Sequence, residues 1–352
     1  MNVAIDHLDR PEGVPVMPFL AADVGGTYAR IALMRASPAG GRDIDVLAYR
    51  RFACADFSGL TEMLKTFVAD EVHTPVRHCV LACAGQVMDD EVLNDNSAWP
   101  IDLRQLSEAM VLDEIAVLND FEALGYAFDN RTDCGGRLLC GPDAHPEGPV
   151  LVIGPGTGLG AAARLPDSAG GHVLTTEAGQ MDFAPNSLRE RDVLAQLAPG
   201  GGYLAYERIV SGPGLLTLYA TLCTLRGKVP WLTTPEGVTE AAAAGSDALA
   251  MEAVEIFCAA LGSFAGSLAM TFMSAGGVYL AGGFLNSIFA LLRRSAFEER
   301  FLHGRSVRAF LQRVPVRVSE HGRNGVLGAA KWYLKRGMSD VKPRQEVVAG
   351  SP

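Results

Sequence analysis

The chain is short of basic residues and of aromatic side chains. Its 352 residues include 30 Lys and Arg against 40 Asp and Glu, so the formal net charge is −10. A surface of that sign repels nucleic-acid phosphate, which disfavours a basic DNA- or RNA-binding protein. Apolar residues make up 49% and charged residues 20%, a globular composition that excludes disordered, collagenous and coiled-coil chains. At about 150 residues per domain, the length predicts two domains.

Cysteine pairs and a targeting segment are also lacking. The seven cysteines are an odd number and include no C-x-x-C pair, which favours small buried side chains in a reducing cytosol over disulfides. The first 18 residues carry charges and three prolines instead of the apolar core of a secretory signal. We therefore expect a flexible arm over 1–18, a flexible tail over 339–352 and a cytoplasmic protein.

One long stretch lacks charge altogether. Residues 256–292 contain no Asp, Glu, Lys or Arg, and Gly262-x-x-x-Gly266 is similar to the contact motif of paired membrane helices. However, Gly276-Gly277 and Gly282-Gly283 interrupt the apolar run. We predict a buried helix, a turn, a buried strand and a further helix rather than a membrane span.

A strand–glycine turn–strand pattern occurs twice. Residues 19–22 and 29–34 flank the first glycine turn, residues 23–27, and predict a β-hairpin. Residues 149–153 and 161–164 flank the second glycine loop, residues 154–160, in the same way. Other predicted strands are 78–84, 115–118 and 278–280, and predicted helices are 187–197, 213–225 and 325–336. The repeat predicts two similarly built α/β lobes that face each other.

The first glycine turn reads Asp23-Val24-Gly25-Gly26-Thr27. Adjacent glycines permit a backbone that a Cβ would block, and the amides of such a turn can point together at phosphate oxygens. Asp23, at the end of a predicted strand, could hold Mg²⁺ through water, because Mg²⁺ keeps much of its hydration. A plain hairpin turn, with the aspartate bonded to its own backbone, explains the same residues equally well.

The second glycine loop has glycines at four alternate positions, Gly154, Gly156, Gly158 and Gly160, with Thr157 among them. Few structural turns need this many glycines, so the loop indicates phosphate binding. Residues 156–161 also fit the G-x-G-x-x-A dinucleotide fingerprint, with Glu177 at a suitable distance. That fingerprint requires a helix directly after the glycines, whereas residues 161–164 and Pro166 predict a strand and a turn. A Walker A loop is excluded, since no G-x-x-x-x-G-K-[ST] occurs.

Polar residues follow two of the predicted strands. Asp120 leaves the strand 115–118 after Asn119, and could accept the proton of a hydroxyl that attacks a phosphoryl group, with no unusual pKa. It could equally be the N-cap of the following helix, or both. The polar segment, residues 177–185, contains Glu177, Gln180 and Asp182, and Glu207 follows it. Several Glu, Asp and Gln side chains of this kind suit the hydroxyls of a neutral sugar.

The last glycine-rich segment, residues 276–283, places glycine pairs at both ends of a short strand. A flat adenine could lie against such a backbone, and tight helix–strand packing fits nearly as well. The histidines show no metal-ligand spacing, so we assign no metal ligands to them.

In this order the segments resemble the bacterial glucokinase family, within the sugar kinase, actin and heat-shock ATPase superfamily. Residues 23–27 and 154–160 are similar to its two phosphate motifs, and 276–283 to its adenosine motif. Residues 118–121 are similar to the segment with the catalytic aspartate, and 177–187 and 207–215 to the sugar-binding blocks. Residues 321–328 are similar to its closing block, so that the resemblance extends from 19 to 336.

The resemblance implies an α/β, two-lobed ribonuclease H-like (actin-type ATPase) sugar kinase fold with a central cleft. The small lobe would comprise 19–130 and 321–338, and the large lobe 131–320. The implied activity is ATP-dependent phosphorylation of a hexose, D-glucose first, at the 6-hydroxyl with Mg²⁺. Homodimers are common in the family, and neither nucleic acid nor a membrane is an expected partner.

The implied site residues follow from the same segments. Asp120 would be the catalytic base and the sugar would be held by Asn119, Asp120, Glu177, Gln180 and Glu207. The ATP phosphates and Mg²⁺ would be held at Asp23, Gly25, Gly26, Thr27, Gly154, Gly156, Thr157, Gly158, Gly282 and Gly283, with Asp23 reaching the metal through water.

Two residues depart from the family pattern. Gln180 stands where the family usually has His, and Tyr28 stands where it usually has Asn and adds bulk near the cleft. These departures leave the preferred hexose open. They also motivate two alternatives, a kinase for a different hexose and a hexose-binding regulatory protein with weak turnover. A nicotinamide-dependent oxidoreductase built on residues 156–161 is a third. A DNA-binding repressor is disfavoured, because an 18-residue arm cannot hold a helix-turn-helix module.

Overall fold

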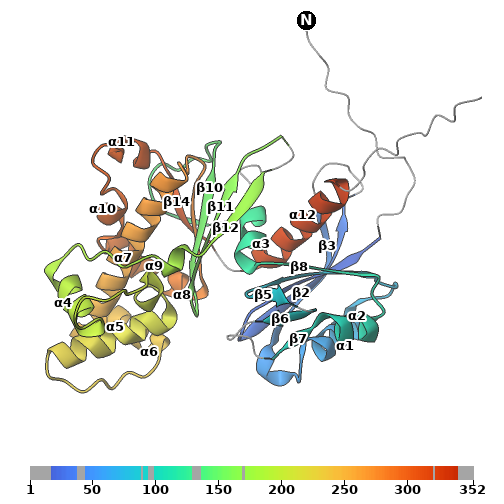
Figure 1. Ribbon diagram of the computed structural model, residues 1–352, viewed down its shortest axis with the longest axis horizontal. Coiled ribbons are helices and arrows are strands. Elements are labelled where there is room, and N and C mark those ends of the chain that lie inside the picture. Colours follow the sequence, from blue (N-terminus) through green and yellow to red (C-terminus); the bar gives the residue numbers. More distant parts are fainter. Residues whose placement is uncertain are drawn as a thin grey trace, which may run out of the picture.

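The computed structural model describes residues 17–37, 44–88, 90–93, 99–128, 136–168, 171–319 and 322–339. These residues form two α/β lobes joined side by side (Figure 1). Nearly all of the expected arm and tail, and the expected lobe boundaries at 130/131 and 320/321, lie outside the described residues.

The small lobe is built on a five-stranded sheet in the order β3-β2-β1-β4-β8. Its strands are β1 (Phe19–Val24), β2 (Tyr28–Ala36), β3 (Ile44–Ala53), β4 (His78–Cys83) and β8 (Glu114–Leu118). β2 runs antiparallel to β1 and β3, whereas β4 runs parallel to β1 and β8. The hairpin predicted around the first glycine turn is confirmed. Three short strands, β5 (Gln86–Met88), β6 (Glu91–Leu93) and β7 (Ile101–Asp102), form a separate small sheet.

Every residue of β1 is buried, because helices pack on both faces of this sheet. Leu20 and Ala22 belong to the core formed with α1 (Leu60–Glu71) and α2 (Leu103–Met110). Phe19 and Ala21 pack instead with the C-terminal helix α12 (Asn324–Ser339). The alternation places the end of β1, with Asp23, between two helical layers.

The large lobe repeats this topology in a six-stranded sheet, β12-β11-β10-β13-β14-β9. Its strands are β9 (Arg137–Cys140), β10 (Val150–Pro155), β11 (Leu159–Leu165), β12 (His172–Thr176), β13 (Gly277–Ala281) and β14 (Val316–Ser319). β10 pairs antiparallel with β11 and parallel with β13, as β1 does with β2 and β4. The predicted repeat of two similarly built units is therefore confirmed.

Most helices of the large lobe lie on the side of its sheet that faces away from the small lobe (Figure 1). They are α4 (Leu188–Leu197), α5 (Gly212–Leu225), α6 (Pro235–Ala244), α7 (Ala248–Thr271), α8 (Gly283–Ser287), α9 (Phe289–Arg294), α10 (Phe297–Phe301) and α11 (Arg308–Leu311). Short 3₁₀ turns occur at η1 (Cys54–Asp56), η2 (Ala178–Gln180) and η3 (Tyr206–Arg208).

The uncharged stretch 256–292 contains most of α7, all of β13 and the start of α9, as predicted. Helix α7 alone among the described helices is long and apolar enough to cross a membrane, yet 83% of its most apolar window is buried. A Cβ on Gly262 would lie 2.3 Å from the Phe297 carbonyl oxygen, and one on Gly266 would lie 2.5 Å from that of Phe301. The G-x-x-x-G pattern therefore allows α10 to pack closely on α7 within the lobe.

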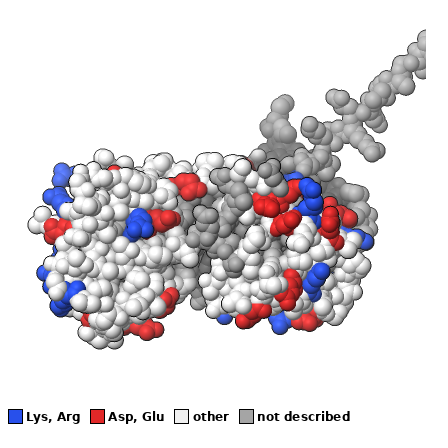
Figure 2. Space-filling model, turned by 60° about the horizontal axis from the view of Figure 1, so that its bottom comes forward, with Lys and Arg blue, Asp and Glu red and all other residues white. Residues whose placement is uncertain are grey.

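The described cysteines are buried and free of disulfides, as expected; Cys134 lies outside the described residues. Burial raises the pKa of Cys79 and of Cys258 to about 12, so both thiols stay protonated at neutral pH. On the face drawn in Figure 2, outside the grey atoms, acidic and basic side chains are interspersed and form no continuous basic patch.

Helix α3 (Asp120–Ala127) lies at the junction of the lobes (Figure 1). It follows β8 of the small lobe and packs against both α12 and the strands β10, β11 and β12. A Cβ on Gly328 of α12 would lie 1.7 Å from the Ala123 carbonyl oxygen, and one on Gly125 would lie 2.6 Å from Val173 Cγ1 of β12. Glycine at these positions lets α3 contact both lobes, so the residues at its start lie where the lobes meet.

Candidate active site

Asn119 and Asp120 stand at the exit of β8, as predicted, but Asn119 and not Asp120 caps the helix that follows. Asn119 is the N-cap of α3: its Oδ1 accepts hydrogen bonds from the amides of Phe121 (2.9 Å) and Glu122 (3.2 Å). The prediction that Asp120 caps the helix is wrong, because the helix begins at Asp120 itself, one residue earlier than an Asp120 cap requires. Asp120 is the first helical residue, and only its Oδ1 accepts from a main-chain amide, that of Phe121 at 3.0 Å.

The Asp120 carboxyl group does not titrate as an ordinary aspartate. Burial raises its pKa to about 6, and the negative charges of Asp23 and, more weakly, Glu177 add to the rise. The expectation of an ordinary pKa is therefore corrected. Asp23 comes from β1 of the small lobe and Glu177 from the segment after β12 of the large lobe. Acidic groups from both lobes thus surround the start of α3, and Asp120 stays mostly ionised at pH 7.

Asp23 is buried at the end of β1. Its Oδ2 lies 3.4 Å from Arg30 Nη1 on the paired strand, and a Cβ on Gly325 at the start of α12 would lie 2.5 Å from the same oxygen. The N-terminus of a helix favours a neighbouring carboxylate. The fold therefore buries the Asp23 carboxyl group beside Arg30 and the start of α12, next to the first glycine turn.

The first glycine turn is a tight, exposed hairpin end. The Gly25 amide donates to the Tyr28 carbonyl oxygen (3.1 Å), while Gly26 and Thr27 are exposed to solvent. The Tyr28 ring lies under the Arg51 guanidinium, 4.5 Å from ring centroid to carbon, and is 39% exposed. Tyr28 is therefore held against the neighbouring strand β3.

The glycines of the second glycine loop have different neighbours. Gly154 and Gly160 pair across the β10–β11 hairpin, and a Cβ on either would come within 2.6 Å of the Phe121 ring. A Cβ on Gly158 would lie 2.5 Å from Glu207 Oε2, whereas one on Gly156 would meet no atom within 4 Å. Gly154 and Gly160 thus lie against the Phe121 ring and Gly158 lies against Glu207. No protein atom fills the space beside Gly156, which leaves room for a ligand.

Glu207 joins the second glycine loop to the polar segment. Its Oε2 accepts from the Leu159 amide (2.8 Å) and its Oε1 accepts from Gln180 Nε2 (3.2 Å). The Tyr203 hydroxyl donates to the Gln180 carbonyl oxygen and also lies 3.4 Å from Gln180 Oε1. Gln180, standing where His is usual, is therefore oriented from both sides. Tyr203 was missed from the sequence, since an aromatic after three glycines gives no periodic signal.

Asp182, the other acid of the polar segment, serves the backbone. Its Oδ1 accepts from the Leu204 amide (3.1 Å), and residues 182 and 205 form an isolated β-bridge. This contact ties the polar segment to the chain just before η3. Of the other polar residues here, Gln180 and Glu207 bond to each other, and the Glu177 charge acts on Asp120 at the start of α3.

The glycine pairs of residues 276–283 lie at opposite ends of β13, so they do not form one site. A Cβ on Gly276 would lie 2.5 Å from the Gly148 carbonyl oxygen, which is a packing contact. A Cβ on Gly282 would lie 2.9 Å from the Pro155 carbonyl oxygen of the second glycine loop, and Gly283 is exposed with no neighbour within 4 Å. Only the second pair adjoins the candidate phosphate-binding backbone.

Comparison with known proteins identifies the family. The sequence model of glucokinase matches residues 20–336. The chain belongs to the glucokinase family. A glucokinase-like protein of Xylella fastidiosa is 40% identical over 319 residues, covering 90% of this chain and 95% of that protein. A glucokinase of Marinobacter nauticus is 36% identical over 312 residues, with 89% and 96% covered.

Solved structures agree with this assignment to the glucokinase family. A glucokinase from an Antarctic psychrotroph superposes with a TM-score of 0.76 at 28% identity, covering 90% of this chain and 98% of that one. A ROK-family glucokinase from Streptomyces griseus, at 19% identity, shares the fold with a TM-score of 0.59. The predicted actin-type sugar kinase fold is confirmed, and this glucokinase-family chain is a hexose phosphotransferase. The nicotinamide alternative is wrong, because the strand β11 follows the glycines where that fingerprint needs a helix.

Proposed function

We propose that the enzyme transfers the γ-phosphoryl group of ATP to the 6-hydroxyl of a hexose, with D-glucose as the preferred acceptor. The observation that carries this proposal is the Asp120 carboxylate. It stands at the junction of two lobes with a pKa of about 6, near the value that suits a general base at neutral pH. The Streptomyces griseus relative was solved with glucose and AMPPNP, and a Balamuthia mandrillaris glucokinase with glucose.

The hexose would lie between α3 and the polar segment. Asn119 uses its Oδ1 to cap α3, which leaves its Nδ2 to donate to a sugar hydroxyl. Glu207 and Gln180 hold each other and keep lone pairs and one amide hydrogen for further hydroxyls. Glu177 supplies a further acceptor. Asp120 then orients the 6-hydroxyl and accepts its proton as the oxygen attacks phosphorus.

The ATP phosphates would contact exposed backbone from both lobes. Gly25, Gly26 and Thr27 offer it in the small lobe, and Gly156 with Thr157 in the large lobe. Gly158 closes the same loop, and Gly282 and Gly283 begin α8 beside it on the adenosine side. Amides fixed in such turns stabilise phosphate charge without reorganising during the reaction.

Mg²⁺ suits the residues at the first glycine turn. The part of the chain that the structure describes holds no group of three possible protein ligands, and Mg²⁺ at phosphoryl-transfer sites uses one or two carboxylates with substrate phosphates and water. Asp23, buried beside the exposed turn, would meet that requirement through water. When bound, Mg²⁺ would neutralise phosphate charge; orienting the hydroxyl and taking its proton belong to Asp120.

The test of this function is a coupled ATP-consumption assay over a panel of hexoses with Mg²⁺. We expect D-glucose to give the highest kcat/KM. A different best hexose would support the alternative sugar kinase, which Gln180 motivates. Binding of hexose without turnover of any of them would support the regulatory protein instead.

The role of Asp120 is tested separately. Asp120→Asn should lower kcat by about 10²–10⁴-fold, the usual effect of losing a general base, while hexose binding measured by calorimetry largely survives. Asp113→Asn, an exposed aspartate on the turn before β8, is the matched control and should leave kcat unchanged. An unchanged kcat in Asp120→Asn removes this residue from the mechanism.

A cytoplasmic location and a homodimer stay predictions, which cell fractionation and sedimentation would check.

A further inference from the structure

A cavity lies in the large lobe, lined by residues other than those assigned above to hexose or nucleotide. It measures about 400 Å³ and lies among α7, α10, the loop after α10 and the end of the polar segment. Volumes of about 300 Å³ and above are typical of small-molecule sites. Its polar lining residues are Asn186, Ser263, Ser267, Arg300, His303 and Arg305.

The charge of this cavity differs in sign from that of the whole chain. Arg300, Arg305 and His303 line it and its lining contains no Asp or Glu, although acidic residues exceed basic ones by ten in the sequence. Glu190 offsets the charge of Arg300, so Arg305 supplies the excess positive charge. Among the described residues, Arg305 and His303 are exposed side chains with no hydrogen bond or ion pair. Such a lining favours an anion over a cation or a neutral ligand.

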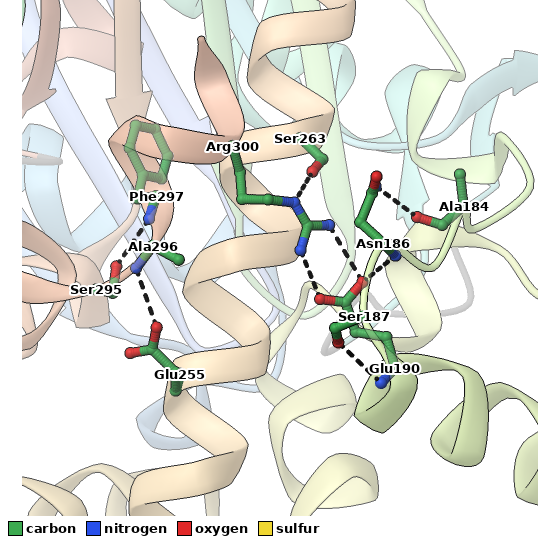
Figure 3. Close-up of polar contacts among 10 residues, drawn as sticks. All are labelled: Ala184, Asn186, Ser187, Glu190, Glu255, Ser263, Ser295, Ala296, Phe297 and Arg300. Carbon is green, nitrogen blue, oxygen red and sulfur yellow. Dashed lines mark hydrogen bonds and ion pairs between the residues drawn. The ribbon is translucent and has the colours of Figure 1, made fainter. Parts of the chain in front are cut away.

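Arg300 fixes the inner end of the cavity. It is 7% exposed and forms a bidentate ion pair with Glu190, Nη1 to Oε1 at 2.6 Å and Nη2 to Oε2 at 3.1 Å. Its Nε donates to Ser263 Oγ at 2.8 Å (Figure 3). These bonds use three of the five N–H groups of a guanidinium. No bond to a described residue uses the remaining two, one on each Nη, and Arg300 lines the cavity; a ligand could accept from them without breaking the pair.

The same ion pair holds the end of the polar segment. Glu190 Oε2 also accepts from the Asn186 amide (2.6 Å), and Asn186 Nδ2 donates to the Ala184 carbonyl oxygen (3.2 Å), as Figure 3 shows. Tyr206, which precedes Glu207, forms another part of the wall and contacts the Phe183 ring at 5.4 Å between centroids. A ligand here would therefore touch the backs of both segments that carry the candidate sugar-binding residues.

We propose that this cavity binds a small phosphate-bearing anion and that its occupation changes the affinity for hexose. The donors come from three side chains of the lining, Arg300, His303 and Arg305, and several separate donors can share the three or four oxygens of a tetrahedral oxyanion better than the two of a carboxylate. The effect on hexose affinity rests on the proposed function, whereas the binding does not.

Binding is tested by calorimetry with inorganic phosphate as the probe, in the presence of saturating glucose and AMPPNP so that the glycine loops are occupied. The wild-type chain should bind one phosphate. Arg305→Ala should bind it about tenfold more weakly, the loss expected for a charge-assisted hydrogen bond. Ser267→Tyr, which fills the mouth from the exposed face of α7, should abolish binding. Arg293→Ala, an exposed arginine of α9 outside the cavity, should bind as the wild type does.

Coupling is tested by steady-state kinetics. Phosphate should change the KM for glucose of the wild type by about fivefold or more, a typical coupling between two sites, and should leave that of Ser267→Tyr unchanged. Equal phosphate binding by the wild type and both cavity variants, or none by the wild type, overturns the site. Binding with an unaltered KM overturns the coupling. A chain that binds phosphate at the cavity but phosphorylates no hexose contradicts the proposed function and leaves the site standing.

Discussion

Asp120 is a carboxylate whose ionisation works against folding. Its pKa is about 6 in the folded protein, whereas an aspartate in an unfolded chain titrates near 3.9. Between these pH values the folded state binds more protons than the unfolded state. By linkage, the proton on Asp120 adds to the free energy of unfolding at low pH. That contribution is lost as the pH rises through about 4 to 6.

Removing the charge should therefore stabilise the protein while it inactivates the enzyme. We expect Asp120→Asn to raise Tm by a few degrees at pH 7 and to leave it nearly unchanged below about pH 3, where the wild-type group is mostly neutral in both states. Differential scanning calorimetry at both pH values measures this, with Asp113→Asn as the control. A lower Tm at pH 7 would mean that Asp120 stabilises the fold by contacts that Asn cannot replace.

In the wild type, kcat/KM should fall as the pH drops through about 6.

We expect Tyr203 to act on the hexose through Gln180. Its hydroxyl bonds the Gln180 carbonyl oxygen and lies 3.4 Å from Gln180 Oε1. Tyr203→Phe should raise the KM for hexose by about two- to tenfold, the worth of one hydrogen bond, with kcat nearly unchanged because Asp120 is not touched. Tyr49→Phe, which removes a hydroxyl bonded to the Gly322 carbonyl oxygen on the small lobe, should alter neither parameter. A loss confined to kcat would instead place Tyr203 in the chemical step.

At this scale the sequence identified the residue types but not their partners. The position of Asp120 at a strand exit was predictable from the apolar run before it. Its cap was not, because Asn and Asp are nearly equal N-caps and a shift of one residue in the helix start exchanges them. The bond between Gln180 and Glu207 joins residues 27 positions apart, and no periodicity links them before the fold does.

At the scale of elements, most strands with buried residues on both faces were predictable, whereas the edge strands β3 and β12 were not. The four-residue β14 was missed although it is buried throughout. β1 and β10 are buried throughout and appear in the sequence as continuous apolar runs. β12 at the edge of its sheet buries only Val173 among its five residues, so its sequence carries almost no alternation. The same holds for β3, whose residues are mostly half-buried or exposed.

The packing of Phe121 on the second glycine loop connects α3 to the large lobe. A Cβ on Gly160 would lie 2.0 Å from Phe121 Cε2, and the ring cannot retreat without moving the start of α3. Gly160→Ala should therefore destabilise the protein by about 1–3 kcal/mol and lower kcat through Asp120. Gly156→Ala, in the same loop with open space at its Cβ, should keep the wild-type free energy of unfolding. Both are measured by urea unfolding.

A second substitution separates this contact from general damage to the loop. Phe121→Leu replaces the ring, with which the new methyl group of Gly160→Ala would clash, by a smaller side chain. The double variant should therefore lose less stability than the sum of the losses in the two single variants. Additive losses would show that the contact between Phe121 and Gly160 does not carry the effect.

At the scale of the whole molecule, one sheet topology occurs twice and the chain crosses between its two copies. α12 follows the large lobe in sequence but packs on β1 of the small lobe and on α3 at the junction of the lobes. The repeat was readable because each copy begins with the same strand–glycine turn–strand pattern. The exact lobe boundaries stay a prediction, since residues 129–135 and 320–321 lie outside the described chain.

If the lobes close on bound hexose, α3 and α12 must stay together while the cleft narrows. Their contact depends on Gly328, where a Cβ would lie 1.7 Å from the Ala123 carbonyl oxygen. Gly328→Ala should therefore lower Tm, lower kcat and raise the KM for hexose together, as changes at a hinge do. It should also reduce the contraction that hexose causes in small-angle X-ray scattering. Gly59→Ala, with nothing within 4 Å of its Cβ, controls for the loss of a glycine. Wild-type kinetics and Tm in Gly328→Ala would show that the close contact of α3 with α12 is not what couples the lobes.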